Sequence, residues 1–85
     1  MEFDELQDMS AMAVKKDFEK NGFGVDVDLI VESLIKALYN FGGSDEEMKN
    51  QITGMTMLFF AVADNYKFDL QDALLTRIEG MNREK

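Results

Sequence analysis

The fold of this chain is decided by the stretch from Asp45 to Phe60, which reads DEEMKNQITGMTMLFF. One face of a helix built from it and the residues that follow carries Met48, Ile52, Met55, Phe59 and Val62. Much of the remaining surface of that helix carries Met57, Leu58, Phe60 and Ala61. A helix that is apolar nearly all round must be buried nearly all round. The stretch therefore predicts a central helix that other helices cover.

Helical spacing of apolar residues continues on both sides of this stretch. A first helix is predicted from about Phe3 to Lys20, and a second from about Val27 to Phe41. The third begins after Ser44 and ends at Asp64 or Asn65, and a fourth follows Asp69. The breaks between them are Asn21-Gly22-Phe23-Gly24, Gly42-Gly43 and Asn65-Tyr66-Lys67. We therefore expect a single all-α domain of four helices over residues 1–85.

Local signals at the helix ends support these boundaries. Ser44 followed by Glu47 is a capping box, in which each side chain satisfies a backbone donor near the other residue. Asp26 or Asp28 is a suitable N-cap for the second helix, and Asp69 for the fourth. Gly42 or Gly43 supplies the left-handed residue that ends the second helix.

Each of the other helices also has an apolar stripe that we expect to be buried. In the first helix the stripe consists of Phe3, Leu6, Met9 and Ala13, continued by Val14 and Phe18. In the second it consists of Val27, Ile30, Val31, Leu34, Ile35 and Leu38, and in the fourth of Leu70, Leu74, Ile78 and Met81. An 85-residue chain does not easily enclose one of its own helices. We therefore expect a homodimer or higher oligomer whose interface contains Met55, Met57, Phe59 and Phe60. The alternative is that Met57 and Phe60 pack on the first helix within one subunit.

Composition excludes several classes of protein. The chain has no Cys and no His, which removes disulfides, thiolate metal sites and the usual general base. Its net charge is −8, from 17 acidic and 9 basic residues, and direct binding to a nucleic-acid backbone calls for the opposite sign. The longest fully apolar run, Met57 to Ala63, is far shorter than the ~20 residues of a membrane span. A cytoplasmic protein without membrane contact is the expectation.

Nearly the whole chain, from the opening MEFDELQ at residues 1–7 to the segment 77–83, resembles the MazG-like nucleotide pyrophosphohydrolases. LIVESLIKAL, residues 29–38, falls where that family has Glu-Glu-x-x-Glu, and EEMKNQITG, residues 46–54, falls where it has Glu-x-x-Asp. FDLQDALL, residues 68–75, is similar to the start of the last helix of the family. The resemblance implies a four-helix scaffold and a magnesium site built from the acidic residues of the first two motifs.

Most of the magnesium ligands that the resemblance implies are replaced here. Glu32 matches the first Glu of the first motif, whereas Ser33 and Lys36 stand in place of the other two. Gln51 and Gly54 stand in place of the Glu and the Asp of the second motif. Mg²⁺ prefers carboxylate oxygens, and we expect Lys36 to pair with Glu32 one turn away. We therefore expect no metal and no cofactor, with Mg²⁺ only if some activity is retained.

The resemblance also places Arg77, Asn82 and Arg83 where the family contacts phosphate. Basic side chains at a helix C-terminus also interact well with its last carbonyl groups, which is the alternative role. The leading hypothesis is a non-catalytic MazG-like protein that acts by protein–protein contact as an inhibitor or adaptor. Small acidic proteins of this sort are found among phage and mobile-element products. Residual Mg-dependent nucleotide binding or pyrophosphohydrolysis is the second hypothesis. An acidic protein that mimics DNA is the third hypothesis. It ranks last because the acidic residues are spread over all four helices and are interrupted by Lys15, Lys16 and Lys20.

Overall fold

The computed structural model describes residues 3–22, 24 and 26–83, and these residues form four α-helices and no strand. The helices are α1 (Phe3–Lys20), α2 (Val27–Tyr39), α3 (Asp45–Asn65) and α4 (Leu70–Arg83). The prediction of an all-α protein with four helices is confirmed. The first and third helices have the predicted limits, and α2 ends two residues earlier than predicted. Phe23, within the first predicted break, lies outside the described residues.

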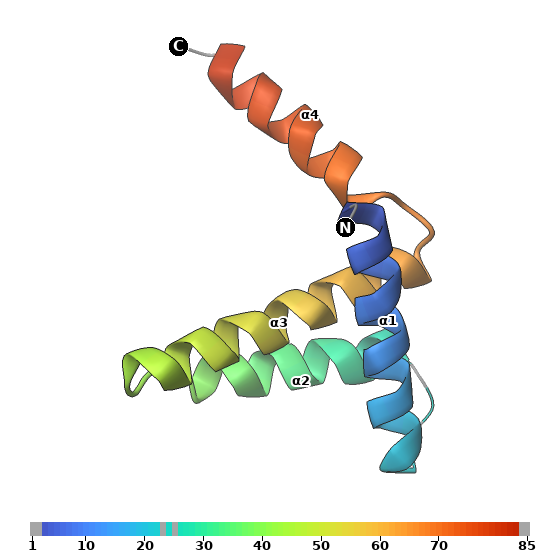
Figure 1. Ribbon diagram of the computed structural model, residues 1–85, viewed down its shortest axis with the longest axis vertical. Coiled ribbons are helices and arrows are strands. Elements are labelled where there is room, and N and C mark those ends of the chain that lie inside the picture. Colours follow the sequence, from blue (N-terminus) through green and yellow to red (C-terminus); the bar gives the residue numbers. More distant parts are fainter. Residues whose placement is uncertain (1–2, 23, 25, 84–85) are drawn as a thin grey trace.

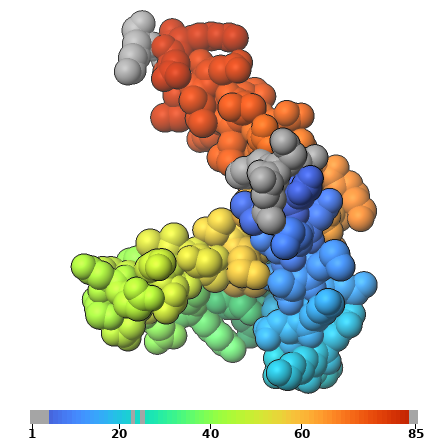
Figure 2. Space-filling view, viewed as in Figure 1, coloured from blue at the N-terminus to red at the C-terminus, as the bar shows by residue number. Residues whose placement is uncertain are grey.

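The helices do not form one compact body. α2 and α3 lie side by side as an antiparallel hairpin, and α1 crosses the end where α2 begins and α3 ends (Figure 1). α4 starts beside the N-terminal end of α1 and projects away from the hairpin. The radius of gyration is 14.5 Å, whereas a compact chain of this length has roughly 12 Å. The space-filling view shows the same open shape, with α4 standing clear of the hairpin (Figure 2).

The core lies where α1, α2 and α3 meet. Val14 of α1, Ile30 and Leu34 of α2 and Ala61 of α3 are buried in one cluster. The partly buried side chains packed against this cluster are those of Phe18, Met55, Met57, Leu58 and Val62. Three of the four helices therefore share one core, and α4 contributes nothing to it.

The buried face of α1 differs from the predicted stripe. Gln7, Ser10 and Val14 are buried, whereas Leu6 and Met9 are about half-exposed. The side chain of Phe3 lies outside the described part of the chain. The prediction is right for Val14 and for Phe18, which packs against the core. It is wrong for Leu6 and Met9, because the angle at which α1 docks on α3 selects the face that is covered, and here a glutamine on that face has partners for both ends of its amide. Gln7 Nε2 donates to the carbonyl of Phe68 at 3.0 Å, and Gln7 Oε1 accepts from the N–H of Leu70 at 3.0 Å.

The predicted N-caps are present. The hydroxyl of Ser44 accepts from the N–H of Glu47 at 3.2 Å, and the Glu47 carboxylate accepts from the N–H of Ser44 at 3.1 Å. These contacts hold the pKa of the Glu47 carboxyl below its usual value. The hydrogen bond from the backbone N–H of Ser44 has the larger effect, and the interaction with the Ser44 hydroxyl has the smaller one. Asp26 caps α2, and Asp69 accepts from the N–H groups of Gln71 and Asp72. Gly42 and Gly43 have φ of +135° and +111°, a region that favours glycine, but they lie beyond the C-cap of α2, which is Asn40. They shape the loop and do not form the left-handed stop predicted for α2.

The end of α3 uses a left-handed residue that is not a glycine. Lys67 has φ of +61°. Its N–H donates to the carbonyl of Asp64 at 3.1 Å, and the N–H of Phe68 donates to the carbonyl of Ala63 at 3.2 Å. These two bonds form a Schellman motif. The conformation costs about 1 kcal/mol for a residue with a Cβ, so this junction is strained.

The three remaining predictions of burial are wrong for the single chain, in part or in full. In the predicted stripe of α2, Ile30 and Leu34 are buried, whereas Val31, Ile35 and Leu38 are exposed. α3 is not covered all round, because Ile52 and Phe59 are more than half-exposed. None of residues 70–83 is buried, and Leu74, Leu75, Ile78 and Met81 are all exposed. Neither these helices nor any other in the described part of the chain is long and apolar enough to cross a membrane.

Candidate functional site

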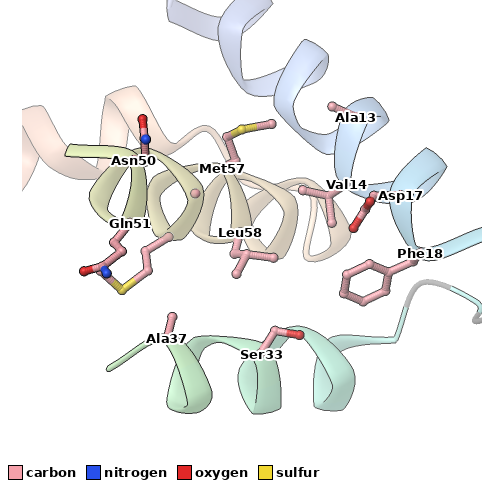
Figure 3. Close-up of a pocket in the computed structure, with 12 residues that line it drawn as sticks. Ala13, Val14, Asp17, Phe18, Ser33, Ala37, Asn50, Gln51, Met57 and Leu58 are labelled. Atoms are coloured by element: carbon pink, nitrogen blue, oxygen red, sulfur yellow. The ribbon is translucent and has the colours of Figure 1, made fainter. Parts of the chain in front are cut away.

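Three of the four residues that replace the expected magnesium ligands, Ser33, Gln51 and Gly54, line one cavity. This cavity has a volume of about 530 Å³ and lies between α1, α2 and α3 (Figure 3). Its lining consists of Ala13, Val14, Asp17, Phe18, Ser33, Ala37, Asn50, Gln51, Gly54, Met55, Met57 and Leu58. The structure thus brings Ser33 of one motif next to Gln51 and Gly54 of the other, in a largely apolar setting.

Gln51 is fully engaged by the backbone of the α2–α3 loop. Its Oε1 accepts from the N–H of Gly42 at 3.0 Å, and its Nε2 donates to the carbonyl of Gly42 at 3.0 Å. A carboxylate could accept the first bond but has no proton to donate for the second. The amide is therefore the group that this position requires, and its oxygen already has a partner.

The other two positions facing the cavity also supply no metal ligand. The hydroxyl of Ser33 donates to the carbonyl of Leu29 at 2.9 Å, one turn back along α2. Gly54 has no side chain, and a Cβ built there meets nothing within 4 Å. The space at Gly54 is therefore open, and no close backbone approach within the chain requires the glycine.

Glu32 and Lys36 line a smaller adjoining cavity of about 390 Å³, together with Asp17. The predicted ion pair between Glu32 and Lys36 is not formed within 4.0 Å, and both side chains are exposed. Exposed pairs gain little in water and lose side-chain entropy, which explains why they stay apart. Among the described residues, no group of three or more acidic side chains is placed to hold a metal ion.

Sequence reasoning did not identify Asp17, which lines both cavities. It lies one turn after Val14 on the face of α1 that meets α2 and α3, where it lines the cavity together with Ser33, Gln51 and Gly54. In the sequence, the spacing from Val14 is the signal that could have pointed to Asp17. That signal can be used only when the buried face of α1 is already known.

The possible phosphate contacts do not join this site. α4 carries Arg77, Asn82 and Arg83 away from the α1–α3 cavities (Figure 1). Arg77 lines a shallow hollow beside Phe68 and Asp72, and Arg83 lies 3.9 Å from Glu79 one turn back. The alternative role of Arg83 at the end of a helix fits this placement.

The four residues predicted to form an oligomer interface lie in different surroundings. Met55 and Met57 are partly buried and pack against the core. Phe60 is only 4% exposed within the single chain, whereas Phe59 is 56% exposed. Of the four, Phe59 alone offers a large free apolar surface.

Comparison of the chain with models of protein families, with curated proteins and with solved structures finds no match. The resemblance to the MazG-like family therefore stays a prediction.

Proposed function

We propose that this chain is a non-catalytic helical protein that acts through protein–protein contact, as an inhibitor or an adaptor. The observation that carries the proposal is α4. Its apolar stripe of Leu74, Ile78 and Met81 is about half-exposed or more, and no residue of the helix is buried. Isolated helices of fewer than roughly 12–15 residues are marginal in water, and α4 has 14 residues including Gly80. A partner that covers the stripe supplies the missing stabilisation.

The surroundings of Gln51 support the non-catalytic part of this proposal. Phosphoryl chemistry depends on metal ions that neutralise developing charge. At the position where the resemblance implies a Glu ligand, the side chain is an amide that pairs with both backbone groups of Gly42. The residue type is thus explained by the structure of the loop, without a role in chemistry.

The exposed apolar residues of the hairpin support self-association as part of the same proposal. Val31, Ile35, Leu38, Ile52 and Phe59 are all more than 40% exposed. Soluble monomers rarely expose large contiguous apolar patches, and such patches mark interaction sites. We propose a homodimer or higher oligomer, with contacts to other proteins made by this assembly.

A second function is favoured by one observation. Asp17 and Glu32 line the same cavity, and Mg²⁺ in nucleotide sites is often held by one or two carboxylates together with the phosphates of the substrate. Residual binding of a magnesium–nucleotide complex is therefore the alternative. It requires that these two side chains, without Ser33 and Gln51, hold the ion.

Calorimetric titration of nucleoside triphosphates into the chain with and without Mg²⁺, followed by an assay for released pyrophosphate, separates the two functions. We expect neither binding heat nor turnover. Magnesium-dependent heat or turnover that is lost in the Asp17→Asn, Glu32→Gln double variant but kept in Asp28→Asn would establish the alternative. Asp28 is the matched control because it is an exposed acid on α2 that lines neither cavity.

A further inference from the structure

The α2–α3 hairpin has an apolar face on the side away from α1, which we call the outer face. Its residues are Val31, Ile35 and Leu38 of α2 and Ile52 and Phe59 of α3. Ser33 and Ala37 line the cavity beneath α1, and Ile35 lies two residues from each of them. Two residues correspond to roughly 200° around a helix, so Ile35 points the opposite way.

The same spacing applies on α3. Ile52 lies two residues from both Asn50 and Gly54, which line the cavity beneath α1. Phe59 lies two residues from Met57, which also lines it. Ile52 and Phe59 therefore point away from α1, to the same side as the apolar residues of α2. Both are more than half-exposed in the single chain, so nothing in the described residues covers this face.

The stripe on α4 matches the outer face in length and chemistry. The stripe from Leu74 to Met81 spans eight residues, as do Val31–Leu38 on α2 and Ile52–Phe59 on α3. Each stripe is therefore roughly 10 Å long at the rise of an α-helix. A helix that lies along the seam between α2 and α3 could bury its own stripe against both of theirs.

The α4 of the same chain is held away from this face. Both hydrogen bonds of the Gln7 amide fix the junction before α4, one to Phe68 and one to Leu70. They place the first turn of α4 beside α1, and the helix then leaves the hairpin (Figures 1 and 2). The occupant of the outer face is therefore not the α4 of that chain.

The area exposed by the chain has the size that a paired structure needs. The solvent-accessible surface is 6607 Å², whereas a compact monomer of 9.7 kDa exposes roughly 5,100 Å². Two chains that each lose the difference bury roughly 3,000 Å² in total, which lies within the range of obligate dimers.

The charge of α4 also permits this pairing. Its two acids, Asp72 and Glu79, balance Arg77 and Arg83, so a neutral helix approaches a chain of net charge −8.

We infer that two copies of this chain pair reciprocally, with α4 of each copy seated on the outer face of the other. This inference rests on the proposed function, because it names the first partner of the exposed stripe. It places the interface on Phe59 and on α4, and not on Phe60.

The test is the mass of the chain in solution by sedimentation equilibrium at high micromolar concentration. We expect twice 9.7 kDa for the unmodified chain. Ile78→Asp on α4 and Phe59→Asp on the outer face should each raise the dissociation constant at least about 100-fold, because each buries unpaired charges in the interface. The matched controls Thr76→Asp and Thr53→Asp, at exposed positions off these two surfaces, should leave the dimer intact.

Each other outcome overturns the inference. A monomeric unmodified chain overturns the pairing and the self-association proposed above, and it leaves contact with a different protein as the role of the exposed stripe on α4. A dimer that survives Ile78→Asp excludes α4, and one that survives Phe59→Asp excludes the outer face. Dissociation by the controls to the same extent means that the effect is general charge repulsion. Circular dichroism checks that each variant keeps at least the helical signal of α1–α3, and Met81→Lys, at a more exposed position of the stripe, repeats the test if Ile78→Asp does not fold. Magnesium-dependent nucleotide turnover would contradict the proposed function without changing these masses.

Discussion

The three helices α1–α3 and the fourth helix α4 are stabilised in different ways. α1, α2 and α3 bury Val14, Ile30, Leu34 and Ala61 against one another. α4 has a clear apolar stripe and an aspartate at its start, yet it buries no residue. The difference shows that an amphipathic pattern and a cap predict where a helix forms, but not that its partner belongs to the same subunit.

Both regions are fastened by a glutamine whose amide binds backbone groups at both ends. Gln51 joins α3 to Gly42, nine residues away, whereas Gln7 joins α1 to Phe68 and Leu70, more than 60 residues away. The hydrogen bonds of Gln51 organise the loop between α2 and α3. The hydrogen bonds of Gln7 set the direction of α4, on which the proposed pairing depends.

The largest expected effect is in the core. Ile30 is 0% exposed and Ile35, on the same helix, is 49% exposed. Ile30→Ala should lower the free energy of unfolding by about 3 kcal/mol because it leaves a cavity. Ile35→Ala should cost about 1 kcal/mol or less in the Ile78→Asp background, which removes the proposed pairing. Urea denaturation measures both, and equal losses would contradict the described core.

The next effect is at the junction between the two regions. Gln7→Ala leaves the Phe68 carbonyl and the Leu70 N–H without their partner in a partly buried place, which should cost about 2 kcal/mol. Hydrogen exchange should become faster in the first turn of α4 and stay unchanged around Ile30. Gln71→Ala is the control, since Gln71 is exposed on α4. Unchanged exchange in α4 would mean that the Gln7 amide does not hold it.

A smaller effect is expected at the second glutamine. Gln51→Glu keeps the acceptor for the Gly42 N–H but sets a carboxylate against the Gly42 carbonyl, which should cost about 1 kcal/mol at neutral pH. The loss should shrink as pH falls, because protonation gives the new side chain a donor. Asn50→Asp adds the same charge one residue away without touching Gly42. A Gln51→Glu variant as stable as the unmodified chain would remove the structural explanation for this position.

The smallest effect is a gain at the end of α3. Lys67→Gly should raise the free energy of unfolding by up to about 1 kcal/mol, because Lys67 adopts φ of +61°. Tyr66→Gly, one residue earlier at φ of −87°, should be destabilising, since nothing there requires a glycine. Thermal unfolding measures both changes, and a loss with Lys67→Gly would show that the side chain has another role at this junction.

Local signals predicted the helices well. The spacing of Ser44 and Glu47 and the pair Gly42-Gly43 depend only on neighbouring residues, so they mark boundaries whatever the rest of the chain does. The buried face of α1 could not be predicted, because Gln7 resembles a surface residue until its two backbone partners, more than 60 residues away, are known. The shared cavity of Asp17 and Glu32 could not be predicted either, because it forms only when α1 docks on the hairpin.

The most direct test of contact through α4 is hydrogen exchange in that helix, compared between the unmodified chain and Ile78→Asp. We expect amides from Leu74 to Met81 to be protected in the unmodified chain at high micromolar concentration. In Ile78→Asp they should exchange nearly as fast as in an unfolded peptide, while amides around Ile30 and Ala61 stay protected. Equal protection of α4 in both proteins, or no protection in either, would contradict the claim that a partner stabilises this helix.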